Sequence, residues 1–221
     1  MILSTEDFLA LPLQVVYADD AMVVLNKPSG LLTVPGRGPE KQDCLSKRAQ
    51  ARYPDVLIVH RLDRDTSGLV VMARGLPAQR VVNLAFEQRR VDKRYVAVVS
   101  GQLPVSEVWQ DIDMPMLVDW PNRPRRTINY TDGQQALTRW RCTAVDVATN
   151  TSRVELEPVT GRTHQLRVHM QAIGHPMVGD TLYAPPDVQA QSARLLLHAA
   201  LLSLPHPVSG ETREYTVAPD F

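Results

Sequence analysis

The sequence has little cysteine and no long hydrophobic run. Its two cysteines, Cys44 and Cys142, lie far apart in the chain, so we expect no disulfide scaffold. No apolar stretch reaches the roughly 18 residues of a membrane-spanning helix. Glu6 and Asp7 stand where a secretory signal would be basic, so no signal peptide is expected either. Together these absences predict a protein of the reducing cytoplasm.

The sequence also lacks the short motifs that bind common cofactors. It contains no G-x-x-x-x-G-K-[ST] loop and no G-x-G-x-x-G after an expected strand. Neither H-E-x-x-H nor C-x-x-C occurs, so we expect no metal site. The G-x-S-x-G motif of serine hydrolases is absent as well. A mechanism without a cofactor remains, and its best candidate for a reactive group is a carboxylate.

The sequence has no excess of positive charge, but most of its positive residues are arginines. The net charge is zero at pH 7, which by itself does not favour a nucleic-acid-coating protein. Lysine is rare, and arginine makes forked contacts to phosphate and stacks on bases. A GC-rich genome would explain the same bias. The local cluster NRPRR, with Arg123, Arg125 and Arg126, is our candidate for RNA phosphate contacts, and a solvated turn is the alternative.

The hydrophobic pattern predicts an α+β protein. We expect strands within 14–26 around Asp19-Asp20, at 68–73, 94–99, 136–147 and 152–159, and in the C-terminal REYTVAPDF. Helices are expected at 43–53 with Asp43 as N-cap, at 78–90 after Pro77, and at 163–173 before Gly174. Loops are expected at 27–38 and 101–133, and 194–204 is either strand or helix. Because the order is not a regular βαβ alternation, we predict one domain over 1–221 with a mixed sheet.

One loop concentrates charge directly before an apolar strand. It reads HRLDRDTSG, from His60 to Gly68, and GLVVMA continues from that glycine. Asp63 stands two residues after Arg61 and directly before Arg64. A nearby guanidinium lowers the pKa of a carboxylate and keeps it ionised, which suits covalent attack more than general-acid catalysis. The alternative is a loop aspartate in a surface salt bridge.

This loop resembles the signature of the RluA-type pseudouridine synthases, H-R-L-D-x-x-T-S-G, and matches it at every fixed position. Other segments agree with the family in the same order: NKPSGLLTVPG, KRYVAVV, TGRTHQLRVHM, GHPMVGDTLY and LLLHA. The resemblance spans roughly residues 15–221. It implies the pseudouridine synthase catalytic fold, with a mostly antiparallel central sheet flanked by helices and loops. The implied activity is the isomerisation of uridine in RNA, without a cofactor.

The resemblance implies roles for four residues. Asp63 is implied to be the essential carboxylate, and whether it attacks the base or the sugar, or removes a sugar proton, stays open. Arg61 is implied to fill the space that the flipped uridine leaves. The alternative is that Arg61 is a structural partner of Asp63. Tyr95 is implied to pack on the flipped base, against the alternative of a core tyrosine. Arg167 is implied to pair with the catalytic aspartate, whereas periodicity alone indicates a solvated helix face.

Further residues are weaker candidates. Leu166 and Leu196 are candidates for lining the base pocket. Lys27, in NKPSG, is a candidate for contacting the RNA backbone, and stabilisation of its loop is an equal alternative. His164 and Gln165 are expected to be structural neighbours of the pocket.

The stretch DWPNRP at 119–124 resembles one branch of the family. About a dozen residues precede the first expected strand, so we expect no appended N-terminal RNA-binding domain. Members of that branch act on a tRNA anticodon stem-loop and a 23S rRNA hairpin, which implies both RNAs as partners of a monomeric enzyme. Three alternatives remain: a non-catalytic RNA-binding or chaperone protein, a synthase for one RNA class, and a glycoside hydrolase using Glu155 or Glu157 as second carboxylate.

Overall fold

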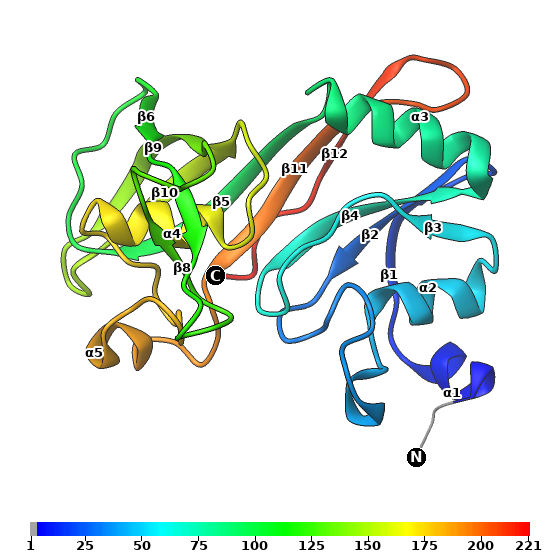
Figure 1. Ribbon diagram of the computed structural model, residues 1–221, viewed down its shortest axis with the longest axis horizontal. Coiled ribbons are helices and arrows are strands. Elements are labelled where there is room, and N and C mark those ends of the chain that lie inside the picture. The colour runs from blue at the N-terminus through cyan, green and yellow to red at the C-terminus, as the bar shows by residue number, and fades with distance from the viewer. Residues whose placement is uncertain (1–3) are drawn as a thin grey trace. The chain divides into compact units, whose positions relative to one another are not determined.

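The chain forms two compact units in the computed structural model, which describes residues 4–221. The first unit contains the described residues up to Lys93, drawn from blue to green in Figure 1, and returns with Ala199–Asp220, drawn in orange to red. The second unit contains Arg94–His198 and Phe221. Within residues 4–221 no helix has the length and apolar character needed to cross a membrane.

The first unit is built on strands, and most of their pairings are antiparallel. In order of pairing these are β1 (Gln14–Ala18), β2 (Met22–Lys27), β4 (Ser67–Arg74) and β11 (Leu197–Pro205), with β3 (Val56–Ile58) also on β4 and β12 (Thr212–Thr216) on β11. All residues of β4 except its last are buried. A strand covered on both faces reads as a continuous apolar run, which explains the unbroken GLVVMA of the sequence.

Helices complete the core of the first unit. They are α1 (Thr5–Ala10), the short 3₁₀ helix Pro39–Lys41, α2 (Leu45–Arg52) and α3 (Gly75–Glu87). From α3, Val82 and Ala85 pack against Met22, Leu69 and Val71 of the sheet. In Figure 1, α3 and α2 lie on opposite sides of β2 and β4. This packing fixes Leu69 and Val71 of β4, the strand that begins at the end of the HRLDRDTSG stretch.

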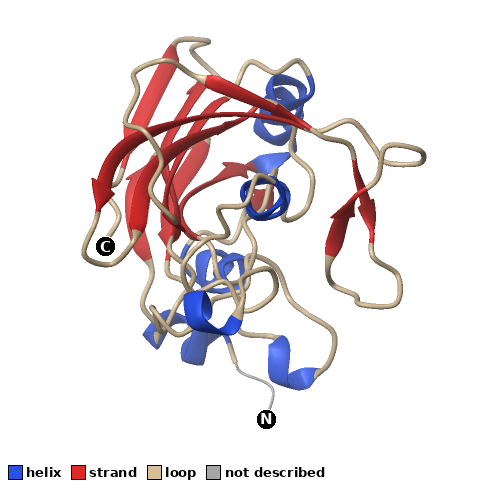
Figure 2. Ribbon diagram, turned by 90° about the vertical axis from the view of Figure 1, so that its left-hand side faces the viewer, coloured by secondary structure: helices blue, strands red, loops and turns tan. Residues whose placement is uncertain are grey.

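The second unit has four strands that pair antiparallel, in the order β5 (Asp92–Ser100), β10 (Thr151–Pro158), β9 (Leu137–Asp146) and β6 (Gln110–Asp113). A separate hairpin joins β7 (Met116–Val118) to β8 (Arg126–Ile128), and the helices are α4 (Gln165–Ala172) and α5 (Pro186–Gln189). Leu166 and Met170 of α4 pack on Val154 and Leu156 of β10. Figure 2 distinguishes these strands from the helices by colour.

The predicted α+β class with a mostly antiparallel sheet is confirmed. Strands β1 and β2 flank Asp19-Asp20 as expected, and β9 and β10 match the two long strands within two residues at each end. Gly174 follows the end of α4 with φ +89°, a conformation that glycine adopts without steric cost. Residues 194–204, left open between strand and helix, lead into β11, a strand.

Several local predictions are wrong. Cys44 rather than Asp43 is the N-cap of α2, and Asp43 instead pairs with Arg48 at 2.6 Å. The helix expected at 78–90 begins three residues earlier, at Gly75, as α3. The turn-rich segment 101–133 contains three short strands, because pairing with distant partners outweighs its local turn preferences. Helix α1, whose capping box joins Ser4 and Asp7, was not expected from the sequence.

Candidate active site

Asp63 lies in the loop between β3 and β4 of the first unit, and its side chain is half-buried. The residue before it, Leu62, is held by two hydrogen bonds to one side chain. The Thr33 hydroxyl donates to the Leu62 carbonyl at 2.7 Å and accepts from the Leu62 amide at 3.2 Å. The backbone entering Asp63 is therefore fixed by a residue of the NKPSGLLT segment.

The residues after Asp63 are held by the same segment. The Lys27 ammonium donates to the carbonyl of Arg64 at 2.9 Å, and the Gly30 amide donates to that same oxygen at 2.9 Å. The Ser29 hydroxyl donates to the Asp65 carbonyl at 2.7 Å. Asp63 thus sits in a short loop whose backbone is fixed on both sides, which positions its carboxylate.

Lys27 is completely buried, with an exposed fraction of 0%. Besides the Arg64 carbonyl, its ammonium donates to the carbonyls of Pro28 at 2.9 Å and Leu31 at 2.7 Å. A buried ammonium needs such partners because desolvation disfavours an unpaired charge. The expectation that Lys27 contacts the RNA backbone is corrected by this burial, and loop stabilisation is the alternative that its contacts fit.

His60 anchors the start of the loop to β4. The Val71 amide donates to His60 Nε2 at 3.0 Å, and the imidazole stacks on Phe86 with ring centroids 4.9 Å apart. Burial, with a smaller contribution from the charge of Lys93, lowers the pKa of His60 to about 3. The ring is therefore neutral at pH 7, and because Nε2 accepts a hydrogen bond, its proton is on Nδ1.

The other charged residues of the loop differ from one another. Arg61 is exposed. Arg64 donates through Nε to Asp65 Oδ1 at 2.9 Å, so the basic neighbour on the C-terminal side of Asp63 forms an ion pair with the next carboxylate. At the end of the loop, a Cβ on Gly68 would stand 2.3 Å from the carbonyl oxygen of Ala199. Only glycine permits that approach, which explains the last letter of the motif.

In the second unit, Arg167 is buried and forms a two-pronged ion pair with Asp180. Its Nε lies 2.7 Å from Oδ2 and its Nη2 lies 2.6 Å from Oδ1. The guanidinium also lies over the Tyr183 ring, 5.1 Å from the centroid. The solvated helix face that periodicity indicated for Arg167 is wrong, because its exposed fraction is 2%. Paired and stacked in this way, the guanidinium is held in one orientation.

Tyr95 and the two candidate leucines also belong to the second unit. Tyr95, opposite Leu156 in the β5–β10 pairing, is half-buried against the core cluster that contains Leu166. Leu166 is itself a core residue, 6% exposed. Leu196 is half-buried and packs against Val178. Tyr95 and Leu196 therefore retain some accessible surface, whereas Leu166 is almost entirely covered.

His164 and Gln165 connect the start of α4 to its surroundings. His164 Nδ1 lies 2.7 Å from the Tyr183 hydroxyl. Gln165 accepts from the Thr160 hydroxyl at 2.7 Å and donates to the Leu137 carbonyl at 2.9 Å. These contacts fit the structural roles expected for both residues, and they fix the helix that carries Arg167.

Comparison with known proteins identifies the family. The family model for RNA pseudouridylate synthase matches residues 21–172. The chain belongs to the RNA pseudouridylate synthase family. The synthase is 45% identical to the "Dual-specificity RNA pseudouridine synthase RluA" of Escherichia coli (strain K12), over 95% of this chain and 94% of that protein. The protein of the same name from Haemophilus influenzae is 41% identical over the same shares.

Solved structures agree with this assignment. The human RNA Pseudouridylate Synthase Domain Containing 1 is 28% identical and has a TM-score of 0.79, covering 100% of the synthase and 87% of that chain. The human RNA Pseudouridylate Synthase Domain Containing 4, at 24% identity, has a TM-score of 0.71 with coverages of 94% and 89%, and supports the fold. The synthase is thus an isomerase that converts uridine in RNA to pseudouridine.

Two residues of the synthase were missed by reasoning from the sequence. Asp180 was not singled out, although GHPMVGDTLY places one carboxylate in an otherwise uncharged stretch. His60 received no role, although it opens the HRLDRDTSG motif. Within residues 4–221, no three His, Cys, Asp or Glu side chains form a group that could hold a metal ion.

The carboxylates considered for a glycosidase are engaged in ion pairs. Glu155 pairs with Arg141 at 2.7 Å, and Glu157 pairs with Arg139 at 3.0 Å and Arg94 at 3.1 Å. These pairs lie across neighbouring strands of one sheet face, where opposite charges stabilise the pairing. The structure therefore gives Glu155 and Glu157 a structural explanation, and the glycosidase alternative loses its second carboxylate.

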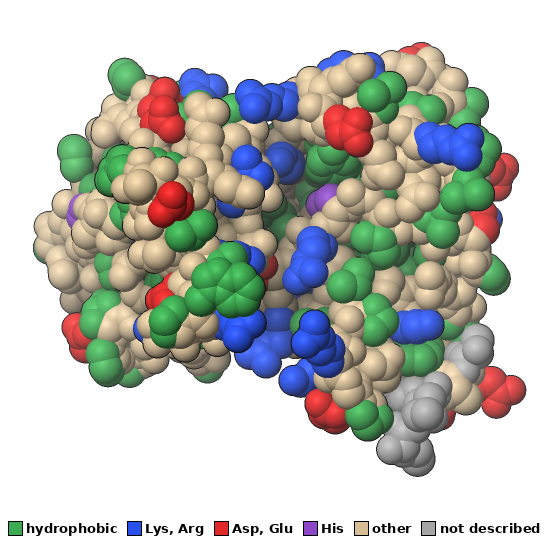
Figure 3. Space-filling view, in the orientation of Figure 1, with side chains coloured by type: hydrophobic (Ala, Val, Ile, Leu, Met, Phe, Trp, Pro, Cys, Tyr) green, Lys and Arg blue, Asp and Glu red, His purple; other side chains and the backbone are tan. Residues whose placement is uncertain are grey.

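The NRPRR cluster lies in the turn of the β7–β8 hairpin and at the start of β8. Arg123 and Arg125 are exposed, and Arg126 is half-buried. The Arg123 guanidinium lies over the ring of Trp120, 4.6 Å from its centroid, and Trp120 is 64% exposed. Figure 3 shows further Lys and Arg side chains on the surfaces of both units.

Proposed function

We propose that this synthase isomerises uridines in stem-loops of both tRNA and 23S ribosomal RNA, with Asp63 as the essential carboxylate. Support for the two RNA classes comes from the relatives whose printed names contain "dual-specificity", at 41% to 46% identity over nearly full length. Their similarity covers 95% of this chain. A synthase that acts on one RNA class is the competing proposal, favoured by no observation of the structure.

The observation that supports Asp63 is the fixed backbone on either side of it. Leu62, Arg64 and Asp65 each accept a hydrogen bond from the 27–33 segment. An ordinary surface loop does not need this many supports, whereas a catalytic group must be held close to its productive geometry. The backbone that carries the half-buried side chain of Asp63 is thus held with little freedom.

The reaction needs no redox partner, because it only rearranges the nucleotide. The bond between ribose C1′ and uracil N1 breaks, the base turns, and a bond forms between C1′ and C5. The proton on C5 leaves and N1 gains a proton, so atoms and electrons balance. The carboxylate of Asp63 is the group proposed to make this rearrangement possible.

The target uridine must leave the helical stack before a side chain can reach it. Unstacking costs a few kcal/mol, and a hairpin loop lowers that cost because its bases are partly splayed. We assign Arg61, exposed beside Asp63, to the space that the uridine vacates. Tyr95 is assigned to pack on the base, and Arg167, oriented by Asp180, to supply a fixed positive charge to the reaction.

The test of Asp63 is an RNA stem-loop labelled with tritium at uridine C5. Asp63→Asn should release no tritium and should melt within about 2 °C of the wild type, since it removes a charge and little packing. Asp65→Asn is the matched control: it changes a carboxylate two residues away, and it should leave release intact. Tritium release by Asp63→Asn, or a collapsed melting temperature, would favour the surface salt-bridge alternative.

The test of the RNA substrates is a map of pseudouridines in total RNA from cells with and without the gene. Loss of pseudouridine from both tRNA and 23S rRNA supports dual specificity. Loss from one RNA class alone would contradict it and establish the competing proposal. Purified enzyme on the two isolated stem-loops separates a direct effect from an indirect one.

We also propose that the synthase acts as a monomer in the cytoplasm. The bacterial relatives are named for action on RNA, and tRNA and ribosomal RNA of a bacterial cell are found in that compartment. Light scattering of the purified protein, with and without a stem-loop, should give the mass of one chain. A mass of two chains would contradict the monomer.

A further inference from the structure

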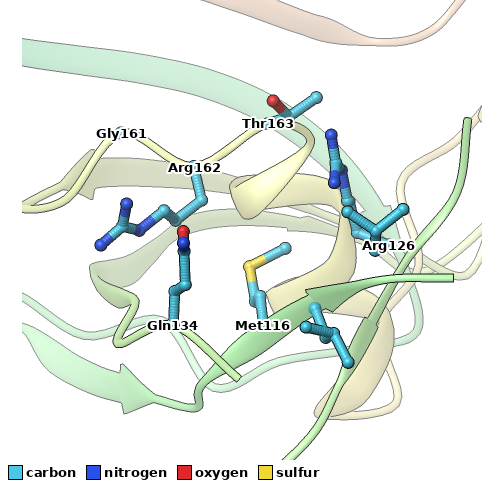
Figure 4. A pocket seen from close by; sticks show the side chains of 8 residues that line it. Met116, Arg126, Gln134, Gly161, Arg162 and Thr163 are labelled. Atoms are coloured by element: carbon cyan, nitrogen blue, oxygen red, sulfur yellow. The ribbon is translucent and has the colours of Figure 1, made fainter. Parts of the chain in front are cut away.

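The second unit contains a pocket whose lining includes none of the residues discussed above as catalytic. Its volume is about 320 Å³, within the range of about 300–1,000 Å³ that small ligands occupy. The walls come from the β7–β8 hairpin, the segment after it and the residues before α4: Met116, Leu117, Val118, Arg126, Gln134, Gly161, Arg162 and Thr163. Figure 4 shows these side chains around the opening.

The pocket is positively charged. Two of its lining residues are arginines and none is acidic. Figure 4 shows the Arg126 and Arg162 side chains on opposite sides of Met116. Arg126 Nε is buried and, within residues 4–221, makes no hydrogen bond. Arg162 uses its Nε for the Gln135 carbonyl at 3.1 Å, which fixes the side chain while a guanidinium keeps further donors. An anionic group would satisfy both arginines.

The rest of the lining is apolar or neutral. Met116 is buried, and Leu117 and Val118 are half-buried. The amide of Gln134 and the hydroxyl of Thr163 add neutral hydrogen-bonding groups. Apolar side chains beside guanidinium groups suit a ligand that has both a ring face and a phosphate, and a nucleotide has both. A free inorganic anion would leave the apolar part unused.

We propose that this pocket binds a nucleotide of the RNA substrate other than the uridine that is isomerised. The inference rests on the proposed function, since it takes the ligand from the same RNA. The lining holds no carboxylate, so the chemistry assigned to Asp63 has no counterpart there, and the pocket serves for binding. The base would lie on Met116 and its neighbours in β7, with the phosphate between the two arginines.

The hairpin that supplies half of the lining points to the same partner. At its turn, the exposed ring of Trp120 carries the stacked guanidinium of Arg123. Aromatic rings and arginines together form the usual surface for unpaired nucleotides, which stack on the ring and place phosphates on the guanidinium. One RNA loop that follows this hairpin would meet both features. The pocket then selects RNA loops that can turn a second nucleotide outward.

Gly161 is a lining residue at which a side chain can be added. A Cβ on Gly161 would have nothing within 4 Å, and its backbone is outside the left-handed region. Gly161→Phe therefore adds a ring at the pocket without backbone strain. We expect its dissociation constant for a tRNA anticodon stem-loop to rise about tenfold, the scale of losing one stacked nucleotide. The slope of log K against log salt should fall by about 0.7, one phosphate contact.

Two controls keep this test decisive. Val147→Phe adds the same ring to a turn of the same unit, at a residue 70% exposed, and should bind RNA as the wild type does. Arg162→Ala removes one guanidinium of the pocket and should also weaken binding and lower the salt slope. Arg52→Ala, an exposed arginine at the end of α2 in the first unit, loses the same charge and should not. Melting temperatures show that each variant is folded.

Binding of uridine 5′-monophosphate, added at millimolar concentration, shows whether the pocket takes a free nucleotide or a nucleotide of the RNA. If folded Gly161→Phe and Arg162→Ala bind the stem-loop with wild-type affinity and salt slope, the proposal is overturned. It is overturned as well if they lose only the monophosphate, because the pocket then takes a free nucleotide. A wild-type protein that binds RNA but forms no pseudouridine contradicts the proposed function alone, since the pocket is tested by binding and not by turnover.

Discussion

The Lys27 ammonium donates a hydrogen bond to the backbone carbonyl of Arg64 at 2.9 Å, although the two residues are 37 positions apart in the chain. This contact joins the NKPSG segment to the loop that carries Asp63. It also explains why a positive charge is tolerated at an exposed fraction of 0%: the ammonium has exchanged water for three carbonyl oxygens.

Replacing Lys27 by methionine tests this support. Lys27→Met keeps much of the side-chain volume and removes the donors, leaving buried carbonyls without their partner. We expect a loss of about 2–4 kcal/mol in the free energy of unfolding, and turnover should fall more than RNA affinity because Asp63 loses its position. Urea denaturation and single-turnover kinetics measure the two effects.

Lys47→Met is the matched control, because Lys47 is exposed on α2. It should change the unfolding free energy by less than about 0.5 kcal/mol. If Lys27→Met weakens RNA binding strongly while its stability is unchanged, the buried role is wrong and the RNA contact expected from the sequence returns.

The Arg167–Asp180 pair predicts a large cost for the loss of one charge. In the wild type, Asp180 Oδ1 accepts hydrogen bonds from the backbone amides of Leu182 and Tyr183. Asp180→Asn keeps an oxygen that can accept them, but it removes the counter-charge of a buried guanidinium. Breaking one side of a buried pair costs about 3–5 kcal/mol. Urea midpoints should show this loss. Asp187→Asn, at an exposed position of α5, should be nearly silent, and an equal effect of both variants would refute the explanation.

The half-buried imidazole of His60 predicts a dependence of stability on pH. Its pKa falls from 6.5 in the unfolded chain to about 3 in the fold, so only the unfolded state takes up a proton between these values. Stability is therefore lost as pH falls from 6.5 towards 3, at up to about 1.4 kcal/mol per pH unit from this group. Urea midpoints at pH 7, 5 and 4 measure the slope.

His60→Gln separates this contribution from that of other groups. Glutamine can still accept the Val71 amide but does not titrate, so the variant should lose less stability than the wild type between pH 6.5 and pH 4. At pH 7 it should be less stable by about 1–2 kcal/mol, because the stacking on Phe86 is weakened. Parallel pH profiles of the two proteins would show that His60 is not the source of the slope.

The hairpin arginines predict a salt effect on RNA binding. Arg123→Ala combined with Arg125→Ala should weaken binding and reduce the slope of log K against log salt by about 1 to 2, since each phosphate contact contributes roughly 0.7 to 0.9. The rate of the bound complex should stay close to that of the wild type. Binding titrations at several salt concentrations and single-turnover rates measure both. An unchanged slope would remove these residues from the RNA contact surface.

The fold class and most of its elements could be predicted from local pattern. Alternating or continuous apolar runs gave β4, β5, β9 and β10, and Gly174 marked the end of α4. The strands inside 101–133 could not be predicted, because β6 depends on pairing with β9 and β7 with β8. A short strand is stable only through such partners, and a local pattern does not show them.

For the candidate site, the sequence alone indicated most of the candidate residues, although not Asp180 or His60. The nine residues HRLDRDTSG and the segments that accompany them indicated the family, and through that resemblance the reaction and Asp63 as the candidate carboxylate. Only the tertiary structure decided how those groups are held. The burial of Lys27, the anchoring of His60 on β4, the pairing of Arg167 with Asp180 and the lining of the charged pocket all depend on contacts between distant residues. Burial and partner choice are properties of the packed chain, since the free energy of a charge depends on what surrounds it.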